Sequence, residues 1–299
     1  MKRCVLYLFL IVASLSSHAQ FTNTLLWRIT GKNLARPSYL FGTMHMLCAD
    51  DIDLSDSLRY AIRNTDKVYL ELEMDNMFEM IAAMQHMAMR NDTTLADLLT
   101  DSEYTVVKRY FNEHTSMLPF SMLETYKPLL TASLIAEQQT TDCGNMVAME
   151  QLIMREAKRN NKKIKGLETM NFQLSIFDKI PYKLQAKQLY LMIVNNNNVE
   201  GDEIKKLTDA YRNQQLETME EMTKKEALGI RNFSNLLLYD RNAAWAQKLD
   251  TLLPLNSLVI AVGAGHLPGN RGVISLLRKA GYKVEPVKNE MIKKKTKEI

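Results

Sequence analysis

The chain has 299 residues, of which 46% are hydrophobic and 24% are charged, so it is long enough to bury a substantial core. Its formal net charge is +4, and removal of Lys2 and Arg3 with an N-terminal signal segment lowers this to +2. Such a balance argues against nucleic acid or strongly anionic partners.

The N-terminus has the pattern of a cleavable signal peptide over residues 1–19. Two basic residues precede the apolar run Val5–Leu15, and Ser17-His18-Ala19 ends in a small-x-small cleavage pattern. The apolar run is short for a membrane span of about 20 residues, and no later stretch approaches that length. We therefore expect the mature chain to begin at Gln20, to reside in the periplasm or outside the cell, and to have no transmembrane segment.

The mature chain keeps two cysteines, Cys48 and Cys143. In an oxidising compartment they could form a disulfide. Two free or buried thiols are the alternative, because the sequence gives no distance between their Cα atoms.

The N-terminal part of the chain predicts strands separated by one helix. Apolar residues alternate or run together between turn residues, and Pro37 closes the first turn. The predicted elements are strands over Thr22–Thr30 and Ser38–Phe41, a helix from Asp53 to about Asn64, and a strand over Lys67–Met74.

The middle of the chain is mostly helical in its hydrophobic periodicity, with one short strand over Lys163–Leu167. The last helices before residue 230 are highly charged, as solvated surface helices are. The predicted helices are Asp75–Arg90, Thr94–Leu99, Ser102–His114, Pro128–Gln139, Asn145–Asn160, a segment from Met170, Pro181–Val194, Glu200–Arg212, Leu216–Ala227 and Asn235–Leu253.

Leu258–Val262 is an unbroken apolar run with three β-branched residues, which predicts a strand buried on both faces. Gly263 and Gly265 let the backbone turn sharply after it. Pro268 suits the first turn of a helix that runs to about Ala280. A last strand is predicted over Tyr282–Val287.

Strands thus gather at the two ends of the chain. We predict a mixed α/β fold, with α+β features, in which N- and C-terminal segments build one central sheet flanked by helices. Asp92–Gln139 and Pro181–Asn232 are then helical insertions. No linker composition interrupts residues 20–299, so we expect a single domain.

Two stretches have the form strand-G-x-x-H. The first ends in Gly42-Thr43-Met44-His45 and the second in Gly263-Ala264-Gly265-His266. A histidine that follows a buried strand lies at the edge of the sheet where ligands bind in α/β folds. Each histidine alone is more readily explained as a satisfied buried side chain, but the matching pair favours one shared site.

Glu71 and Glu73 are predicted to lie on one face of the strand Lys67–Met74. Two imidazoles and a carboxylate, here His45, His266 and one of the two glutamates, are a common ligand set for a catalytic divalent metal ion such as Mn²⁺, Co²⁺ or Zn²⁺. The other glutamate would act as general base and acid.

Several polar residues are candidates for holding the substrate. Arg241 could bind a carboxylate or stabilise an oxyanion, or could form an ion pair with Asp240 or a site glutamate. Glu168 could line the pocket or cap the helix that follows it. Thr43 could orient a ligand or bond the local backbone.

The predicted helix Asp75–Arg90 carries a stripe of methionines, Met77, Met80, Met84 and Met87. A copper-binding Met/His patch is one interpretation in an exported protein. An apolar core or groove stripe, with methionine as adaptable filler, is the simpler interpretation.

These residues resemble the TraB/GumN family, which includes the Tiki proteases that act on Wnt proteins. The resemblance spans nearly the whole mature chain. It rests on L-L-W-R-I-T at Leu25–Thr30, Y-L-F-G-T-M-H at Tyr39–His45, V-Y-L-E-L-E at Val68–Glu73, G-L-E-T at Gly166–Thr169, R-N at Arg241-Asn242, and V-G-A-G-H-L-P-G at Val262–Gly269.

The resemblance implies a helix-flanked β-sheet similar to that of erythromycin esterases and haem-binding ChaN proteins. It also implies metal-dependent peptide hydrolysis, with His45, His266 and Glu71 in the positions of the family's site residues. Asn242 enters the site as a substrate-binding candidate through the R-N motif. The family often has an aspartate where this chain has Glu73, so either carboxylate could be the ligand.

Three functions are compatible with these patterns. The first is an exported metal-dependent hydrolase that acts on a peptide or another small molecule. The second is a metal-free hydrolase in which a histidine, oriented by a glutamate, activates water. The third is a non-enzymatic ligand-binding or envelope protein that uses the same cleft.

Overall fold

The computed structural model describes residues 23–45, 47–49, 52–114, 118–139, 146–194, 200–225 and 233–291. The predicted signal peptide and Cys143 lie outside these residues. Within them, no helix is both long enough and apolar enough to span a bilayer.

The central element is a six-stranded mixed sheet in the order β6-β4-β7-β2-β1-β8. β6, β4, β7 and β2 are parallel to one another, whereas β1 is antiparallel to both β2 and β8. As predicted, the sheet combines segments from both ends of the chain. Its strands are β1 (Leu26–Gly31), β2 (Ser38–Thr43), β4 (Lys67–Leu70), β6 (Lys163–Gly166), β7 (Leu258–Gly263) and β8 (Tyr282–Pro286).

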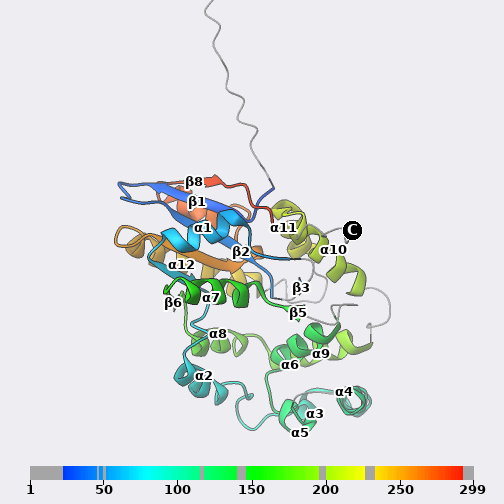
Figure 1. Cartoon of the computed structure of the whole chain (residues 1–299). Coiled ribbons are helices and arrows are strands. Elements are labelled where there is room, and N and C mark those ends of the chain that lie inside the picture. The colour runs from blue at the N-terminus through cyan, green and yellow to red at the C-terminus, as the bar shows by residue number, and fades with distance from the viewer. Residues whose placement is uncertain are drawn as a thin grey trace, which may run out of the picture.

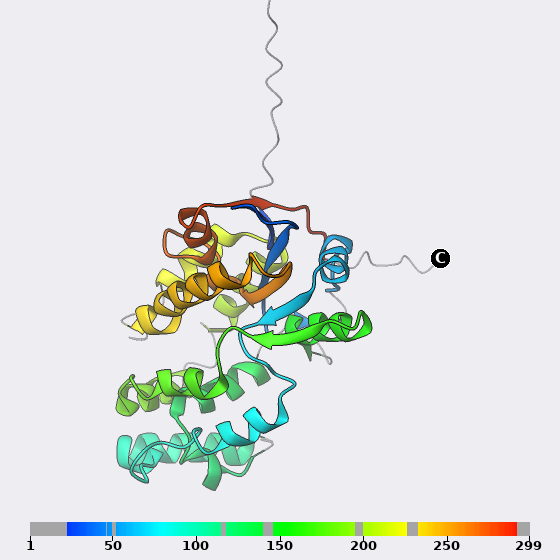
Figure 2. The same ribbon diagram turned by 90° about the vertical axis from the view of Figure 1, so that its left-hand side faces the viewer.

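The sheet is covered on both faces, which explains why β2 and β7 are buried almost throughout. In Figure 2 one pair of helices lies to the left of the strands and the other pair to the right. The left pair is α12 (Asp240–Leu252) and α13 (Val273–Lys279), and the right pair is α1 (Asp56–Asn64) and α7 (Met149–Arg159).

A layer of helices lies below the sheet in Figures 1 and 2 and buries a second hydrophobic cluster, which includes Leu95, Phe111 and Leu189. The number of folding domains stays a prediction. The helices of this layer are α2 (Met77–Met84), α3 (Leu95–Leu98), α4 (Asp101–Glu113), α5 (Phe120–Leu123), α6 (Pro128–Gln139), α8 (Met170–Phe177) and α9 (Tyr182–Val194).

The remaining elements connect these layers. A two-stranded sheet, which the sequence patterns did not predict, pairs β3 (Leu47–Cys48) with β5 (Met146–Val147). The other elements are helices α10 (Glu200–Arg212) and α11 (Leu216–Lys225), a π-helical turn η2 (Asn235–Tyr239) and a 3₁₀ turn η3 (Ala264–His266).

Two helices are shorter than predicted: α2 ends at Met84 instead of Arg90, and α7 begins at Met149 instead of Asn145. Two other predicted boundaries are wrong for backbone reasons. β4 ends at Leu70 instead of Met74, because the chain bends closely over Gly166, where an added Cβ would lie 2.8 Å from the backbone nitrogen of Glu73. The last helix begins at Val273, because Gly269 has a positive φ of 81° and ends the regular backbone that follows Pro268.

The methionine stripe does not line the main core. Of the residues on α2, only Ala83 is buried. Its large apolar side chains are exposed, including Phe78 at 86% and Met77 at 69%. Of the core or groove stripe expected here, the core interpretation is therefore wrong, and α2 presents an apolar surface beside α8.

Candidate functional site

The four parallel strands end at one edge of the sheet, and the candidate residues follow those ends. Glu71 follows β4, Glu168 follows β6 and His266 ends the 3₁₀ turn after β7. Because β7 lies between β4 and β2, this edge places His266 between Glu71 and the segment of His45. Both G-x-x-H turns therefore follow neighbouring parallel strands at this edge.

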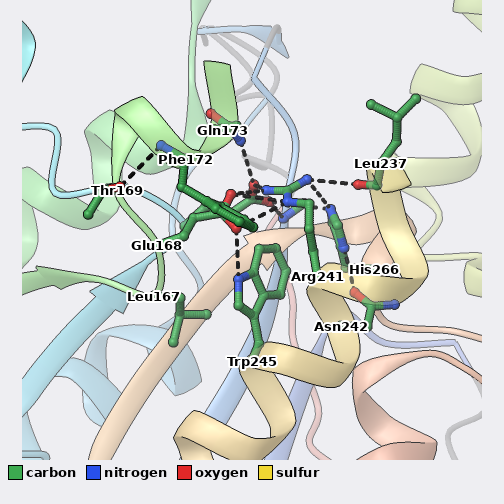
Figure 3. A network of polar contacts seen from close by, with 12 residues as sticks. Leu167, Glu168, Thr169, Phe172, Gln173, Leu237, Arg241, Asn242, Trp245 and His266 are labelled. Carbon is green, nitrogen blue, oxygen red and sulfur yellow. Dashed lines mark hydrogen bonds and ion pairs between the residues drawn. The ribbon is translucent and has the colours of Figure 1, made fainter. Parts of the chain in front are cut away.

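Arg241 is the centre of a buried network at this edge (Figure 3). Its Nη2 atom lies 2.6 Å from Oε2 of Glu71 and 2.5 Å from Oε1 of Glu168. Its Nε atom also donates to Glu168, at 3.0 Å from Oε1. The side chain is only 8% exposed. Of the two roles predicted for Arg241, binding a substrate anion and forming an ion pair, the structure shows the ion pair, with the site glutamates.

The π-helical turn η2 immediately precedes α12 and contributes to this geometry. Nη1 of Arg241 donates to the carbonyl oxygen of Leu237, at 2.9 Å. A π turn widens the helix and is frequent at functional sites. The backbone of η2 therefore supplies a third acceptor to the guanidinium, in addition to the two carboxylates.

Glu168 is held inside the network instead of capping a helix. Its Oε2 atom accepts a hydrogen bond from the indole nitrogen of Trp245, at 3.1 Å. The cap of α8 is the next residue, Thr169, whose side chain accepts from the backbone nitrogen of Phe172 at 3.2 Å. Figure 3 shows both arrangements on the same side of Arg241.

His266 is fixed through one ring nitrogen. Its Nδ1 atom lies 2.6 Å from Oδ1 of Asn242, whose Nδ2 donates to the carbonyl oxygen of Arg271 at 2.9 Å. Since the amide nitrogen is committed to that carbonyl, Oδ1 faces the imidazole and accepts from Nδ1–H. The lone pair of the neutral ring is then on Nε2.

Nε2 of His266 faces the charged centre of the network. It lies 3.3 Å from Nη1 of Arg241 and 3.8 Å from Oε1 of Glu71. The Trp245 ring packs against the imidazole, with 4.5 Å between ring centroids. The structure therefore brings His266, Glu71, Glu168, Arg241 and Asn242 together.

The environment keeps His266 neutral. Burial lowers its pKa to about 4, and the positive charges of Arg241 and His45 act in the same direction, against the attraction of Glu71. At neutral pH, Nε2 of His266 is therefore unprotonated.

The two carboxylates differ in their pKa. Burial raises the pKa of Glu71, but the attraction of His266 and Arg241 and the Gly263 N–H outweigh it, so the net shift is downward. The Gly263 N–H that contributes lies 2.7 Å from Oε1. Arg241 lowers the pKa of Glu168, but burial and the charge of Glu71 raise it by more, so the net shift is upward.

His45 lies outside this network of bonds. Its Nδ1 atom is 3.1 Å from Oε1 of Glu150, and its side chain is 70% exposed whereas that of Glu150 is 7% exposed. Thr43 is buried beside the same glutamate. Burial raises the pKa of Glu150, but His45 and the Thr43 hydroxyl lower it by more.

Glu73 lies away from His266. Because β4 ends before it, Glu73 does not share a strand face with Glu71, and that expectation is wrong. Its Oε1 atom pairs with Nζ of Lys165, at 2.9 Å. A cavity of about 340 Å³ lies here, lined by Glu73, Glu79, Gly166, Leu167, Glu168, Thr169, Phe172 and Lys248.

The donor atoms do not form the predicted three-ligand metal site. Across the described part of the chain, no group of three or more His, Cys, Asp or Glu side chains has a geometry that could hold a metal ion. Nε2 of His266 and Oε1 of Glu71 are 3.8 Å apart, but Oε1 accepts from the Gly263 N–H and Arg241 occupies the other oxygen of Glu71.

Cys48 is disulfide-bonded in the structure. Its expected partner, Cys143, lies outside the described residues. Cys48 ends β3, which pairs with β5 just before α7.

Two residues of the site were missed by sequence reasoning. Glu150 lies on the buried face of α7 with Met149, Ile153 and Ala157, so an acidic residue at an apolar helical position was the available signal. Trp245 lies four residues after Arg241, on the same face of α12, and both side chains are buried.

Comparison with known proteins places this fold in a family. Residues 25–286 match the model of the TraB/PrgY/gumN family. Similar proteins include Metalloprotease TIKI2 of Danio rerio, 24% identical over 88% of this chain and 61% of that protein. They also include the Metalloprotease TIKI homolog of Nematostella vectensis, 22% identical over 90% and 68%, and Metalloprotease TIKI1 of Homo sapiens, 22% identical over 88% and 62%.

The chain therefore aligns with about three fifths of the length of the two vertebrate relatives. No solved structure gives a significant match. The family model, in contrast, covers all six strands of the main sheet and every residue of the network around Arg241. The chain belongs to the TraB/PrgY/gumN family.

Proposed function

We propose that this protein is a metal-dependent hydrolase that acts on peptides, in the periplasm or outside the cell. The observation that carries the proposal is the approach of Nε2 of His266 to Oε1 of Glu71, 3.8 Å apart among largely buried side chains. A neutral imidazole and an ionised carboxylate are the groups that a hydrolytic site needs to bind and move protons. Distant similarity to proteins named metalloproteases supports the reaction class.

Each side chain has a role in this proposal. Arg241 keeps Glu71 ionised and holds it against the Gly263 N–H, through contacts of 2.6 and 2.7 Å. Glu168 and Trp245 hold Arg241 in turn. Burial keeps His266 unprotonated, so that Nε2 can accept a proton or bind an electrophile.

The test combines metal analysis with a peptide-cleavage screen. Purified protein is assayed for bound metal and for cleavage of a peptide library with Mn²⁺, Co²⁺ and Zn²⁺, beside His266→Ala and Glu71→Gln. We expect cleavage that a strong chelator abolishes and that both variants lower by about 10²-fold or more. His86→Ala is the matched control, because His86 is an exposed imidazole just after α2 and is not one of the residues bonded around Arg241.

A metal-free hydrolase is the second candidate, and the arrangement of the possible ligands favours it. In the described part of the chain, no group of three or more His, Cys, Asp or Glu side chains could hold a metal ion. In this candidate, Nε2 of His266 takes a proton from water as the water oxygen attacks a carbonyl carbon. Cleavage that survives the chelator but not His266→Ala would select it over the metal-dependent enzyme.

A further inference from the structure

The two G-x-x-H histidines share a feature that their sequences do not show. In each, Nδ1 faces a side-chain oxygen: Oε1 of Glu150 for His45, at 3.1 Å, and Oδ1 of Asn242 for His266, at 2.6 Å. Both oxygens belong to residues at the start of a helix that packs on the sheet, Glu150 on α7 and Asn242 on α12.

We propose that Glu150 and Asn242 are paired positioning residues, each of which holds one G-x-x-H imidazole by Nδ1–H so that its lone pair is on Nε2. The proposal rests on the proposed function and extends it to His45, whose Nε2 would then serve the same site as Nε2 of His266. An acceptor on Nδ1 fixes both the tautomer and the orientation of an imidazole, as in sites where the other nitrogen does the chemistry.

The first G-x-x-H turn is built around the start of α7. The backbone nitrogen of Met149 donates to the carbonyl oxygen of Met44, at 3.1 Å. The Tyr211 hydroxyl donates to the carbonyl oxygen of Gly42, at 3.0 Å. These two bonds fix the backbone on both sides of Thr43, and Oε1 of Glu150 lies 3.1 Å from Nδ1 of His45.

Among the described contacts, Glu150 interacts with the ring of His45 and with the buried Thr43 hydroxyl, and it has no ion pair with Lys or Arg. Its side chain is 7% exposed, and its Oε2 atom makes no hydrogen bond of ordinary geometry within the described residues. A buried carboxylate is costly unless it is paired. The pair with His45 therefore accounts for an acidic residue at this apolar position of α7.

The choice of a carboxylate for one ring and an amide for the other follows from their surroundings. His45 is largely exposed, so its ring can pair with the buried carboxylate of Glu150 at little cost in desolvation of the imidazole. His266 is buried beside Glu71 and Glu168, which already share the single charge of Arg241. A third carboxylate at position 242 would lack a cation, whereas the Asn242 amide orients the ring without adding charge.

The test reads the tautomer of each ring directly. Protein labelled with ¹⁵N-histidine is examined by ¹⁵N–¹H correlation spectra at mildly alkaline pH, where neutral rings show which nitrogen carries hydrogen. We expect Nδ1–H for both His45 and His266 in the wild-type protein. Assignment uses His45→Gln and His266→Gln. An Nε2–H ring at either position in the wild-type protein overturns the proposal, whatever the variants do.

The variants separate positioning from folding. Glu150→Leu removes the acceptor, and we expect His45 to revert to the tautomer mixture of an exposed imidazole while His266 is unchanged. Glu150→Gln keeps an acceptor oxygen and is expected to restore Nδ1–H. Glu156→Leu is the matched control, because Glu156 is a buried glutamate of the same helix that pairs with Arg59 at 3.0 Å and not with a histidine.

The rate of peptide hydrolysis is the second measurement. Glu150→Leu is expected to lower kcat about 10- to 100-fold with little change in KM, with recovery in Glu150→Gln. An unchanged tautomer in Glu150→Leu contradicts the positioning role even if kcat falls. If the tautomers behave as expected but no peptide is cleaved by the wild-type protein, positioning stands and the proposed function fails.

Discussion

Arg241 and Glu71 form a buried ion pair between residues 170 positions apart, with Nη2 of the arginine 2.6 Å from Oε2 of the glutamate. The same guanidinium binds Glu168. One cation therefore balances two carboxylates at the edge of the sheet. Burial lowers the pKa of Arg241, but Glu168 and Glu71 raise it by more, so its charge is secure.

We predict that Arg241→Met lowers the free energy of unfolding by about 3–5 kcal/mol, because it leaves two buried carboxylates without a cation. Urea denaturation followed by circular dichroism measures the loss. Arg271→Met is the control: its side chain is 53% exposed and 3.7 Å from Asp240, so we expect a loss of about 1 kcal/mol or less. Similar losses in the two variants would show that the network does not depend on its central cation.

We predict that stability rises with pH between about 4 and 6.5 because of His266. Its pKa is lowered to about 4 in the folded protein from 6.5, so within this window the unfolded chain binds a proton that the folded chain does not. Stability is full above 6.5 and is lost as the pH falls, by roughly 3 kcal/mol at most for such a shift.

Glu71 extends this loss to lower pH. Its folded pKa is below 4.5, so its contribution is present above that value and disappears as the pH falls through the folded pKa. Denaturation at a series of pH values measures both effects. His266→Gln should flatten the curve between pH 4 and 6.5, and an unchanged slope in that variant would assign it to other groups.

We predict that Gly263→Ala impairs the site whereas Gly265→Ala does not. A Cβ at Gly263 would lie 3.2 Å from Oε1 of Glu71, the atom that accepts from the Gly263 N–H at 2.7 Å. Displacing this charged hydrogen bond costs about 1.5–3 kcal/mol, so we expect hydrolysis to fall by roughly tenfold or more.

At Gly265 nothing lies within 4 Å of an added Cβ. Gly265→Ala should therefore change stability by no more than about 0.5 kcal/mol and should leave hydrolysis near the wild-type rate. Peptide-cleavage rates and melting temperatures of both variants decide the comparison. Equal impairment would mean that the whole turn, and not the contact with Glu71, is sensitive.

We predict that the apolar surface of α2 contributes little to folding. Phe78 is 86% exposed, so Phe78→Ser should change the free energy of unfolding by about 0.5 kcal/mol or less while it lowers the binding of the dye ANS. Leu189, which is fully buried in the helical layer, is the comparison, and Leu189→Ala should cost about 2–5 kcal/mol. A large loss in Phe78→Ser would place that ring in a contact within the fold.

Local patterns determined a large part of this protein. The apolar run Leu258–Val262 and the glycines after it are sufficient to predict a buried strand that ends in a turn with His266. Parallel strands end at one edge of a sheet, so the sequence also places Glu71, Glu168 and both histidines near that edge. These features depend on hydrophobic periodicity and glycine, which act over a few residues.

Only the tertiary structure decided which side chains meet. It pairs Arg241 with Glu71 and Glu168, binds His45 to Glu150, and turns Glu73 toward Lys165 where the chain bends over Gly166. Each pairing joins segments that are distant in sequence, and it depends on strand register, on where a strand stops and on burial. A contact of 3 Å follows from these quantities together, and no local pattern of residues contains them.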